Sequence, residues 1–340
     1  MNAELYTLNR PDEILTPALI YYEDLIRENT EKVLKTAGGP QRLWPHVKSH
    51  KMTAMVRMQL KMGITRFKCA TLAEARMAAE AGAQHVLLAY PLVGPNIGAF
   101  ISLTLRYPAV QFYALGDDIG CLRALDREAE KRQTIIQVFI DVNMGMNRTG
   151  VETGRLYEFT RACMDFTHLK FSGFHCYDGH VHTFEPLKRQ AEVESMMEPI
   201  ASVVTKLDAE GIRVPMLIAG GSPSFPCHVG EPDVFLSPGT VFLWDSGYLE
   251  RYPDLGLTPA AAVMTRVISH PAEGLFTLDL GCKGIASDPP GSRGVVVGLE
   301  QRRGDRLGFL CDPHPHLPHH GPLPPGLGGK RRGDYRGMDR

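Results

Sequence analysis

The chain has 340 residues, which suits either one large barrel with an accessory domain or two separate domains. Its 37 Lys and Arg residues nearly balance its 38 Asp and Glu residues, so the charge pattern predicts neither a nucleic-acid partner nor an acidic membrane surface. The seven cysteines are scattered, without a Cys-x-x-Cys pair, and indicate reduced thiols in a cytoplasmic protein.

The N-terminal segment lacks the basic region and apolar core of a signal peptide, and no apolar run approaches the roughly 18 residues of a membrane-spanning helix. We expect a strand over residues 15–22 and then a helix that starts at Tyr22 or Asp24. From residue 43 onward, short apolar runs alternate with amphipathic helical patterns. The predicted strands of this region lie at residues 43–47, 66–70, 85–89, 110–114, 135–141, 169–175, 215–219 and 234–237.

Strands that alternate with helices indicate parallel βαβ units, because two parallel strands need a long crossover connection. Eight such units close an α/β fold of the (β/α)8 TIM-barrel type, which we place at residues 23–255; a doubly wound open sheet is the alternative. Residues 256–300 predict a smaller β-rich domain, which the strand within residues 1–22 joins. Residues 301–340 are rich in Pro, Gly and His without a helical or strand period, so we expect a disordered or aberrant tail.

Lys48 ends the first predicted barrel strand and lies between His46 and His50. Neighbouring cationic groups and partial burial lower the pKa of a lysine amine, which would let Lys48 act as a nucleophile towards an aldehyde. The alternative is a basic turn that faces solvent.

Glycine-rich turns with Ser or Thr follow the last two barrel strands, where backbone N–H groups and hydroxyls build phosphate sites. Arg148, just after the fifth strand, suits a phenolate or phosphate oxygen, or alternatively an ordinary salt bridge. A phosphate site opposite the Lys48 amine implies pyridoxal 5'-phosphate (PLP), whose aldehyde and electron-accepting ring these groups serve. The expected phosphate-binding residues are Gly220, Gly221, Ser222, Gly239 and Thr240.

The sixth predicted barrel strand leads into Tyr177 and His180 at the same end of the barrel. The three His and the Asp of this stretch, His175, Asp178, His180 and His182, suit either metal binding or proton transfer. We interpret Tyr177 as an aromatic contact of the cofactor and His180 as a candidate catalytic acid or base. A polar rim without a catalytic role is the alternative. Weaker pocket candidates are Lys68, Cys69, Tyr90 and, in the β-rich domain, Lys283.

Taken together, these residues resemble the fold-type III PLP enzymes, whose barrel is that of the alanine racemase N-terminal domain. The likeness is greatest to the D-threonine aldolase and D-serine dehydratase branch. It implies that Lys48 is the Schiff-base lysine, that Arg148 contacts the PLP phenolate oxygen, that the glycine-rich turns hold the phosphate, and that the protein is a homodimer. The matching stretches are TPALIYY (16–22), RLWPHVKSHK (42–51), GITRFKCATLAEA (63–75), GMNRTG (145–150), YDGHVH (177–182), AGGSPSF (219–225), SPGT (237–240) and LDLGCKGIASD (278–288).

The resemblance implies a PLP-dependent lyase whose small-molecule substrate is a D-β-hydroxy amino acid. We place D-threonine aldolase-like cleavage to glycine and an aldehyde first. D-serine dehydratase activity, which yields a 2-oxo acid and ammonia, is an alternative, and so is a racemase, which needs a second base opposite Lys48. A non-catalytic PLP-binding or homeostasis protein is a further alternative.

The resemblance also implies a divalent metal, Mn or Zn, held by a C-terminal His-x-Cys or His-x-Asp pair that this chain lacks. Residues 315–329, PHLPHHGPLPPGLGG, can be encoded by codons that, read one base later, give HICPTTALYPRAWVV, which resembles the metal motif of the family. We therefore hypothesise that the tail is a frameshifted reading, which sequencing of the coding DNA around codons 300–320 tests. If the tail is genuine, the weak candidate metal ligands are His314 and His316, with His319 and His320 beside them.

Overall fold

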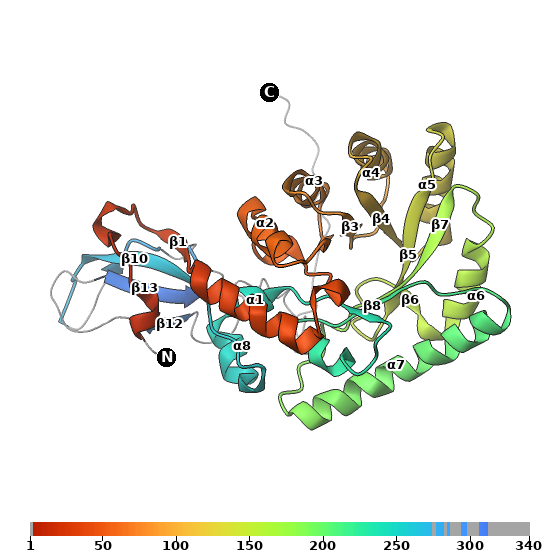
Figure 1. Ribbon diagram of the computed structural model, residues 1–340. Helices are drawn as coiled ribbons and strands as arrows, with labels where there is room; N and C mark the ends of the chain where they lie inside the picture. The colour runs from red at the N-terminus through yellow and green to blue at the C-terminus, as the bar shows by residue number, and fades with distance from the viewer. Residues whose placement is uncertain (1–2, 274–276, 282–283, 286–293, 298–305, 312–340) are drawn as a thin grey trace, which may run out of the picture.

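The computed structural model describes residues 3–273, 277–281, 284–285, 294–297 and 306–311. Two sheets organise this part of the chain: a curled parallel sheet with helices on its outer side, and a smaller antiparallel sheet (Figure 1). Helix α1, Glu23–Ala37, runs from the antiparallel sheet towards the parallel one. Among the described helices, none combines the length and apolarity that a membrane crossing needs.

The parallel sheet has the strand order β2-β3-β4-β5-β7-β8-β9, with the short β6 paired to the end of β5. Apart from the short β6, strands that are neighbours in this sheet also follow one another in the sequence, as repeated βαβ units produce. The strands are β2 Arg66–Cys69, β3 His85–Leu88, β4 Gln111–Gly116, β5 Ile136–Asn143, β6 Val151–Glu152, β7 Leu169–Cys176, β8 Leu217–Ala219 and β9 Val234–Leu236.

The segment Leu43–His46 closes the ring between β9 and β2. The N–H of Trp44 donates to the carbonyl of Leu236 at 2.7 Å, and the N–H of Lys68 donates to the carbonyl of Pro45 at 2.8 Å. This segment, predicted as the first barrel strand, makes isolated bridges instead of a continuous ladder, because Pro45 has no N–H to donate. The predicted barrel fold is therefore confirmed, with an irregular first strand.

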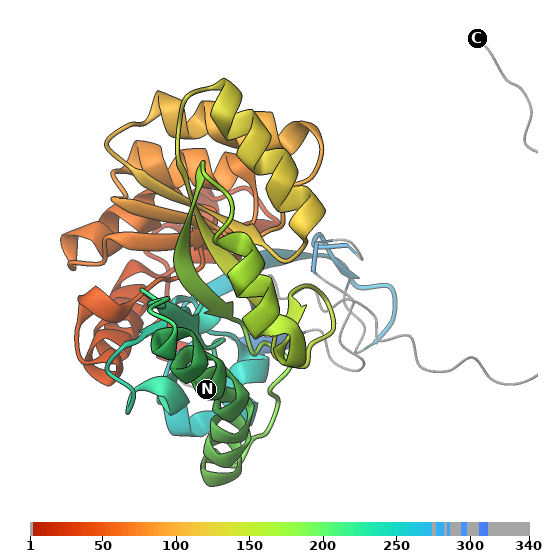
Figure 2. The same cartoon turned by 90° about the vertical axis from the view of Figure 1, so that its right-hand side faces the viewer.

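Helices α2 to α7 cover the outer side of the parallel sheet (Figures 1 and 2). Their ends use local capping: at the start of α3 the hydroxyl of Thr71 accepts the N–H of Glu74, and Gly82 ends the helix at φ 107°. The helices are α2 Thr53–Lys61, α3 Leu72–Ala81, α4 Pro95–Arg106, α5 Ile119–Lys131, α6 Thr153–Cys163, α7 Pro186–Ala209 and, after β9, α8 Ser246–Arg251.

An aromatic cluster fills the inside of the barrel. The ring of Trp44, which is fully buried, lies edge-on to Tyr113 and Phe139 at centroid distances of 5.4 and 6.2 Å, an arrangement that aromatic pairs prefer. A second, larger apolar cluster fills the layer between the strands and the helices. The barrel is thus a packed core, and the chemistry is left to the ends of its strands.

The antiparallel sheet has the order β1-β10-β13-β12, with β11 on the edge of β10, so it joins both ends of the described chain. The sequence predicts no regular structure after residue 301, and this expectation is wrong for Arg306–Cys311, which form β13. β13 pairs with β10 on one edge and with β12 on the other. This pairing stabilises a strand that the local sequence pattern does not predict. The strands are β1 Ala18–Tyr21, β10 Ala261–Ser269, β11 Thr277–Leu278, β12 Gly294–Val297 and β13 Arg306–Cys311.

Candidate active site

Three cationic side chains face the ring of Tyr177 at the carboxyl ends of the barrel strands. The Nζ atoms of Lys48 and Lys68 lie 5.7 and 5.0 Å from the ring centroid, and the guanidinium carbon of Arg148 lies 5.3 Å from it. They come from the turn after the closing segment, from β2 and from the loop between β5 and β6. The face of an aromatic ring attracts cations, so Tyr177 gathers residues that are far apart in the sequence. Lys48, Arg148 and Tyr177 itself are predicted from the sequence as site residues, and Lys68 only as a weaker pocket candidate.

Lys48 lies in a 3-10 turn, Val47–Ser49, which His46 holds in place: its Nδ1 accepts the N–H of Lys48 at 3.2 Å. Burial lowers the pKa of the Lys48 amine, and the positive charge of Arg148 lowers it further, while Glu74 partly opposes the shift. Both main causes disfavour the ammonium form. The Lys48 amine therefore loses its proton more readily than a solvent-exposed lysine does, which makes the nucleophilic form easier to reach.

Lys68 is almost completely buried, with 1% of its surface exposed. Its Nζ donates to Ser237 Oγ at 2.8 Å and lies 3.3 Å from His175 Nε2. Burial above all, and then the charge of Lys48, lower the pKa of Lys68 to about 7. The sequence ranks Lys68 only as a weak candidate, because one lysine inside an apolar run does not reveal its partners.

A hydrogen-bonded chain leads from Lys68 through His175 to Asp141. His175 Nδ1 lies 2.7 Å from Asp141 Oδ1, and the hydroxyl of Thr149 donates to Asp141 Oδ2 at 2.7 Å. Burial and the neighbouring Lys68 lower the pKa of His175, although Asp141 partly opposes this, so the imidazole is neutral and Nε2 accepts from Lys68. The sequence marks Asp141 only as the end of a predicted strand. It marks His175 only as one of three His that suit metal binding or proton transfer, without its partners.

The two glycine-rich turns meet at Ser222. Its Oγ accepts the backbone N–H of Thr240 at 2.9 Å and that of Gly239 at 3.3 Å, and converging N–H and hydroxyl groups of this kind bind anions. Gly220 has φ 85°, and a Cβ there would lie 2.8 Å from the Cα of Phe225, so only glycine fits this turn. One pocket lies between these turns and the Tyr177 cluster; its lining includes Lys48, Lys68, Tyr177, Ser222, Gly239 and Thr240.

A buried carboxylate, Asp178, holds the first of these turns in place. It accepts the N–H of Gly221 and the hydroxyl of Ser224, both at 2.7 Å, and lies 3.1 Å from His228 Nε2. Burial by itself would raise the pKa of Asp178, but the hydrogen bonds of these three partners lower it on balance. The N–H of Gly221, expected to bind phosphate, therefore already donates to Asp178.

The remaining predicted residues lie around this pocket or away from it. His180 packs against Gly145, where a Cβ would lie 3.0 Å from its Nε2, and His182 rather than His180 lines the pocket of Lys48. Cys69 is buried, which raises the pKa of its thiol, and Tyr90 is 60% exposed. Lys283, His314, His316, His319 and His320 lie outside the described residues.

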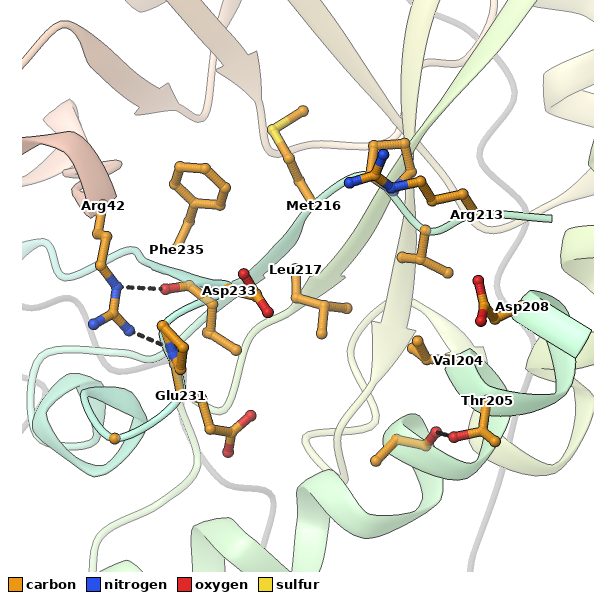
Figure 3. A pocket seen from close by; sticks show the side chains of 16 residues that line it. Arg42, Val204, Thr205, Asp208, Arg213, Met216, Leu217, Glu231, Asp233 and Phe235 are labelled. Atoms are coloured by element: carbon orange, nitrogen blue, oxygen red, sulfur yellow. Dashed lines mark hydrogen bonds between the residues drawn. The ribbon is translucent and has the colours of Figure 1, made fainter. Parts of the chain in front are cut away.

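A roomier cavity, of about 890 Å³, lies at the amino ends of β8 and β9 beside the end of α7 (Figure 3). Arg213 and Arg42 are its basic lining residues, and the guanidinium of Arg42 already donates to the carbonyls of Val234, Val229, His228 and Glu231. This end of a barrel serves stability, whereas the carboxyl ends carry active sites. The pocket around Tyr177 is therefore the candidate site.

The barrel is parallel, a lysine follows its first strand, and glycine-rich turns follow its last two strands. These features define the class of protein: an α/β barrel with an amine beside an anion-binding pocket. The family model "Alanine racemase, N-terminal domain" matches residues 23–241, and the chain belongs to this family. The membership drawn from the sequence motifs is thereby confirmed.

Known relatives act on hydroxy amino acids. The chain is similar to a 3-hydroxy-D-aspartate aldolase of Paracoccus denitrificans (strain Pd 1222), with 26% identity over 295 residues that cover 81% of this chain and 74% of the relative. The structure of a D-threonine aldolase from Filomicrobium marinum matches with a TM-score of 0.76 and 26% identity, covering 90% of this chain and 85% of that one. The fold is also shared by a D-threo-3-hydroxyaspartate dehydratase from Delftia sp. HT23, with a TM-score of 0.75, 20% identity, and coverage of 88% and 84%.

Proposed function

We propose that this protein is a PLP-dependent lyase that acts on D-β-hydroxy amino acids, with retro-aldol cleavage to glycine and an aldehyde as its reaction. The observation that carries the proposal is that Lys48, an amine of lowered pKa, lines the same pocket as the Ser222 hydroxyl and the N–H groups of Gly239 and Thr240. A phosphorylated aldehyde requires such a pairing of amine and anion cradle. The two similar aldolases suggest the substrate class.

The donor set of the pocket fits PLP group by group. Lys48 would bind the aldehyde carbon and Arg148 would face the phenolate oxygen. The phosphate would be bound by the Ser222 hydroxyl and by the Gly239 and Thr240 N–H groups, which donate to Ser222 in this structure and would turn to the phosphate. Tyr177, which already lies among the cations, would contact the ring. When bound, the cofactor supplies an electron-accepting ring that stabilises charge left on the substrate when a bond to its Cα breaks.

The chain itself would then orient the substrate and move protons. We assign proton transfer to His180, whose buried Nδ1 has no hydrogen-bond partner in the described part of the chain and which packs against Gly145 in the loop that carries Arg148. An unsatisfied imidazole nitrogen is costly to keep unless it has a use. His182, which lines the pocket, is the neighbouring position to compare with it.

Dehydration to a 2-oxo acid is the second candidate function. It requires a base that removes the α-proton, and the pocket holds two amines of lowered pKa, Lys48 and Lys68. Retro-aldol cleavage needs a base at the β-hydroxyl instead, so the product distinguishes the two reactions.

We also propose that the activity depends on a divalent metal, Mn or Zn. Within the described residues no group of three His, Cys, Asp or Glu side chains could hold a metal ion, and the weak candidates His314 and His316 lie outside them. If residues 301–340 are a frameshifted reading, a chain with the frame restored would gain metal-dependent turnover. We further propose a cytoplasmic homodimer, which light scattering after size-exclusion chromatography tests.

Product analysis of the purified chain tests the function. The protein, with PLP and with or without Mn or Zn, is incubated with D-3-hydroxyaspartate, D-threonine and D-serine, and glycine, 2-oxo acids and L-isomers are measured. We expect glycine and the matching aldehyde. Lys48→Ala should abolish both turnover and the visible absorbance of lysine-bound PLP, while Lys61→Ala, which removes an exposed lysine at the end of α2, should preserve both.

Other products, or no product, would support a different function. A 2-oxo acid with ammonia would support the dehydratase, and L-isomers would support a racemase. A lysine-bound cofactor without turnover under any metal would support a PLP carrier. Wild-type protein that never develops the absorbance would refute the PLP proposal altogether.

A further inference from the structure

The pocket contains one more amine than a single PLP attachment requires. Lys68 and Lys48 both lie over the ring of Tyr177, at 5.0 and 5.7 Å, and Arg148 adds a third positive group at 5.3 Å. Burying several like charges together is costly, because the low dielectric interior strengthens their repulsion. A second buried amine beside Lys48 is therefore expected to have a role in the site, and the contacts of Lys68 indicate which role.

The charged surroundings of the two amines differ. Lys48 faces Arg148 and, more weakly, the carboxylate of Glu74. Lys68 has two acceptors in direct contact, Ser237 Oγ and His175 Nε2. The other titratable groups that act on Lys68 are Lys48, Asp178, Asp141, Arg148 and the imidazole of His46.

These contacts make Lys68 a good receiver for a proton. A protonated Lys68 would keep both hydrogen bonds, and the carboxylates of Asp141 and Asp178 favour its charge. With Lys48 charged, repulsion and burial bring the pKa of Lys68 to about 7, so Lys68 is largely neutral just above neutral pH. Interacting groups of this kind titrate as a pair.

We propose that Lys48 and Lys68 share one positive charge, so that Lys68 takes up the proton that Lys48 loses when it reacts with an aldehyde. The proton leaves the Lys48 ammonium and ends on Lys68 Nζ; the neutral Lys48 amine then forms its bond to the aldehyde carbon, and water leaves. Lys68 acts through Lys48 and is a positioning residue rather than a catalytic one. The inference rests on the proposed PLP function and deepens it.

Proton linkage tests the inference without any turnover. The affinity of the full chain for PLP is measured between about pH 7 and 9 by titrating the absorbance of lysine-bound cofactor, and the slope of log affinity against pH gives the protons released. In Lys68→Met the proton has no acceptor, so PLP binding should release one more proton than in the wild type, which adds a further tenfold change in affinity for each pH unit. Lys68→Arg should instead keep the slope of the wild type, because the permanent charge of arginine leaves Lys48 without a proton to release when PLP binds.

Ser237→Ala is the matched control. It removes a hydrogen bond of Lys68 but leaves both amines, so its affinity is expected to fall while its pH slope stays that of the wild type. Equal slopes in wild type and Lys68→Met would overturn the inference and leave the PLP proposal standing. If the wild type binds no PLP, the proposed function fails first. If Lys68→Met does not fold, Lys68→Gln carries the same prediction, because its neutral amide can contact Ser237 and His175 but takes up no proton.

Discussion

Gly179 provides the space that the ring of Tyr177 occupies. A Cβ at this position would lie 2.2 Å from Tyr177 Cζ, so Gly179→Ala must displace the ring from the three cations around it. Overpacking of this kind costs about 1–3 kcal/mol, and we expect the affinity for PLP to fall about 10- to 100-fold. Absorbance titration measures it.

Gly154→Ala is the control for this substitution. Gly154 lies in α6, and no atom lies within 4 Å of the position that an alanine methyl group would take, so this variant should bind PLP as the wild type does. Equal affinities in Gly179→Ala and wild type would show that the ring position does not matter for the cofactor.

Among single residues, the sequence predicts site residues that belong to a recognisable motif. It misses site residues that only the packing of the folded chain brings together. Lys48 and Arg148 follow strand ends and can be placed from the strand count alone. The role of Lys68 depends on Ser237, 169 residues away, and on His175. No local pattern states that these side chains meet.

A bulge in β7 sets the register that builds the site. The pairing of β5 with β7 runs Val138 to Phe171 and then, after a shift, Phe139 to Gly173, which places Asp141 opposite His175. Without the extra residue, Asp141 would face Phe174, whose side chain belongs to the other side of the strand. The sequence predicts the two strands but not this register, and so it misses the pair.

Gly173 should be indispensable to this bulge. It has φ 129°, and a Cβ there would lie 1.8 Å from the carbonyl oxygen of Met216 in the segment before β8. Backbone strain and the clash together predict that Gly173→Ala lowers the free energy of unfolding by about 2–6 kcal/mol and abolishes PLP binding. Urea unfolding and absorbance titration measure the two effects.

Gly211→Ala separates strain from the clash. Gly211 also has a positive φ, 77°, but no atom lies within 4 Å of its Cβ position, so this variant should lose only about 1 kcal/mol and retain PLP. Similar losses in both variants would mean that the approach of Met216 to β7 is not what requires glycine.

For the whole molecule, alternation of strands and helices is enough to predict the barrel, because each βαβ unit is local in sequence. The antiparallel sheet is not local: β1 pairs with the distant β10, in the register Ala18 to Met264. Its strand β13 receives its shape from β10 and β12 rather than from its own pattern. The barrel could therefore be predicted strand by strand, whereas the extent of the second sheet could not.

Asn29 joins the two parts of the molecule. It is fully buried in α1, its Nδ2 donates to the carbonyls of Phe242 and Thr258, and its Oδ1 accepts the N–H of Thr258 at 2.9 Å. Asn29→Leu keeps the volume but leaves these backbone groups unpaired, at a cost of about 1–3 kcal/mol for each. We expect the free energy of unfolding to fall by at least about 3 kcal/mol, measured by urea unfolding with circular dichroism and with the fluorescence of Trp44 and Trp244. Glu28→Ala, one residue earlier on the exposed side of α1, should change stability by less than about 0.5 kcal/mol; a loss as large as that of Asn29→Leu would place the effect in the helix itself and not in the junction.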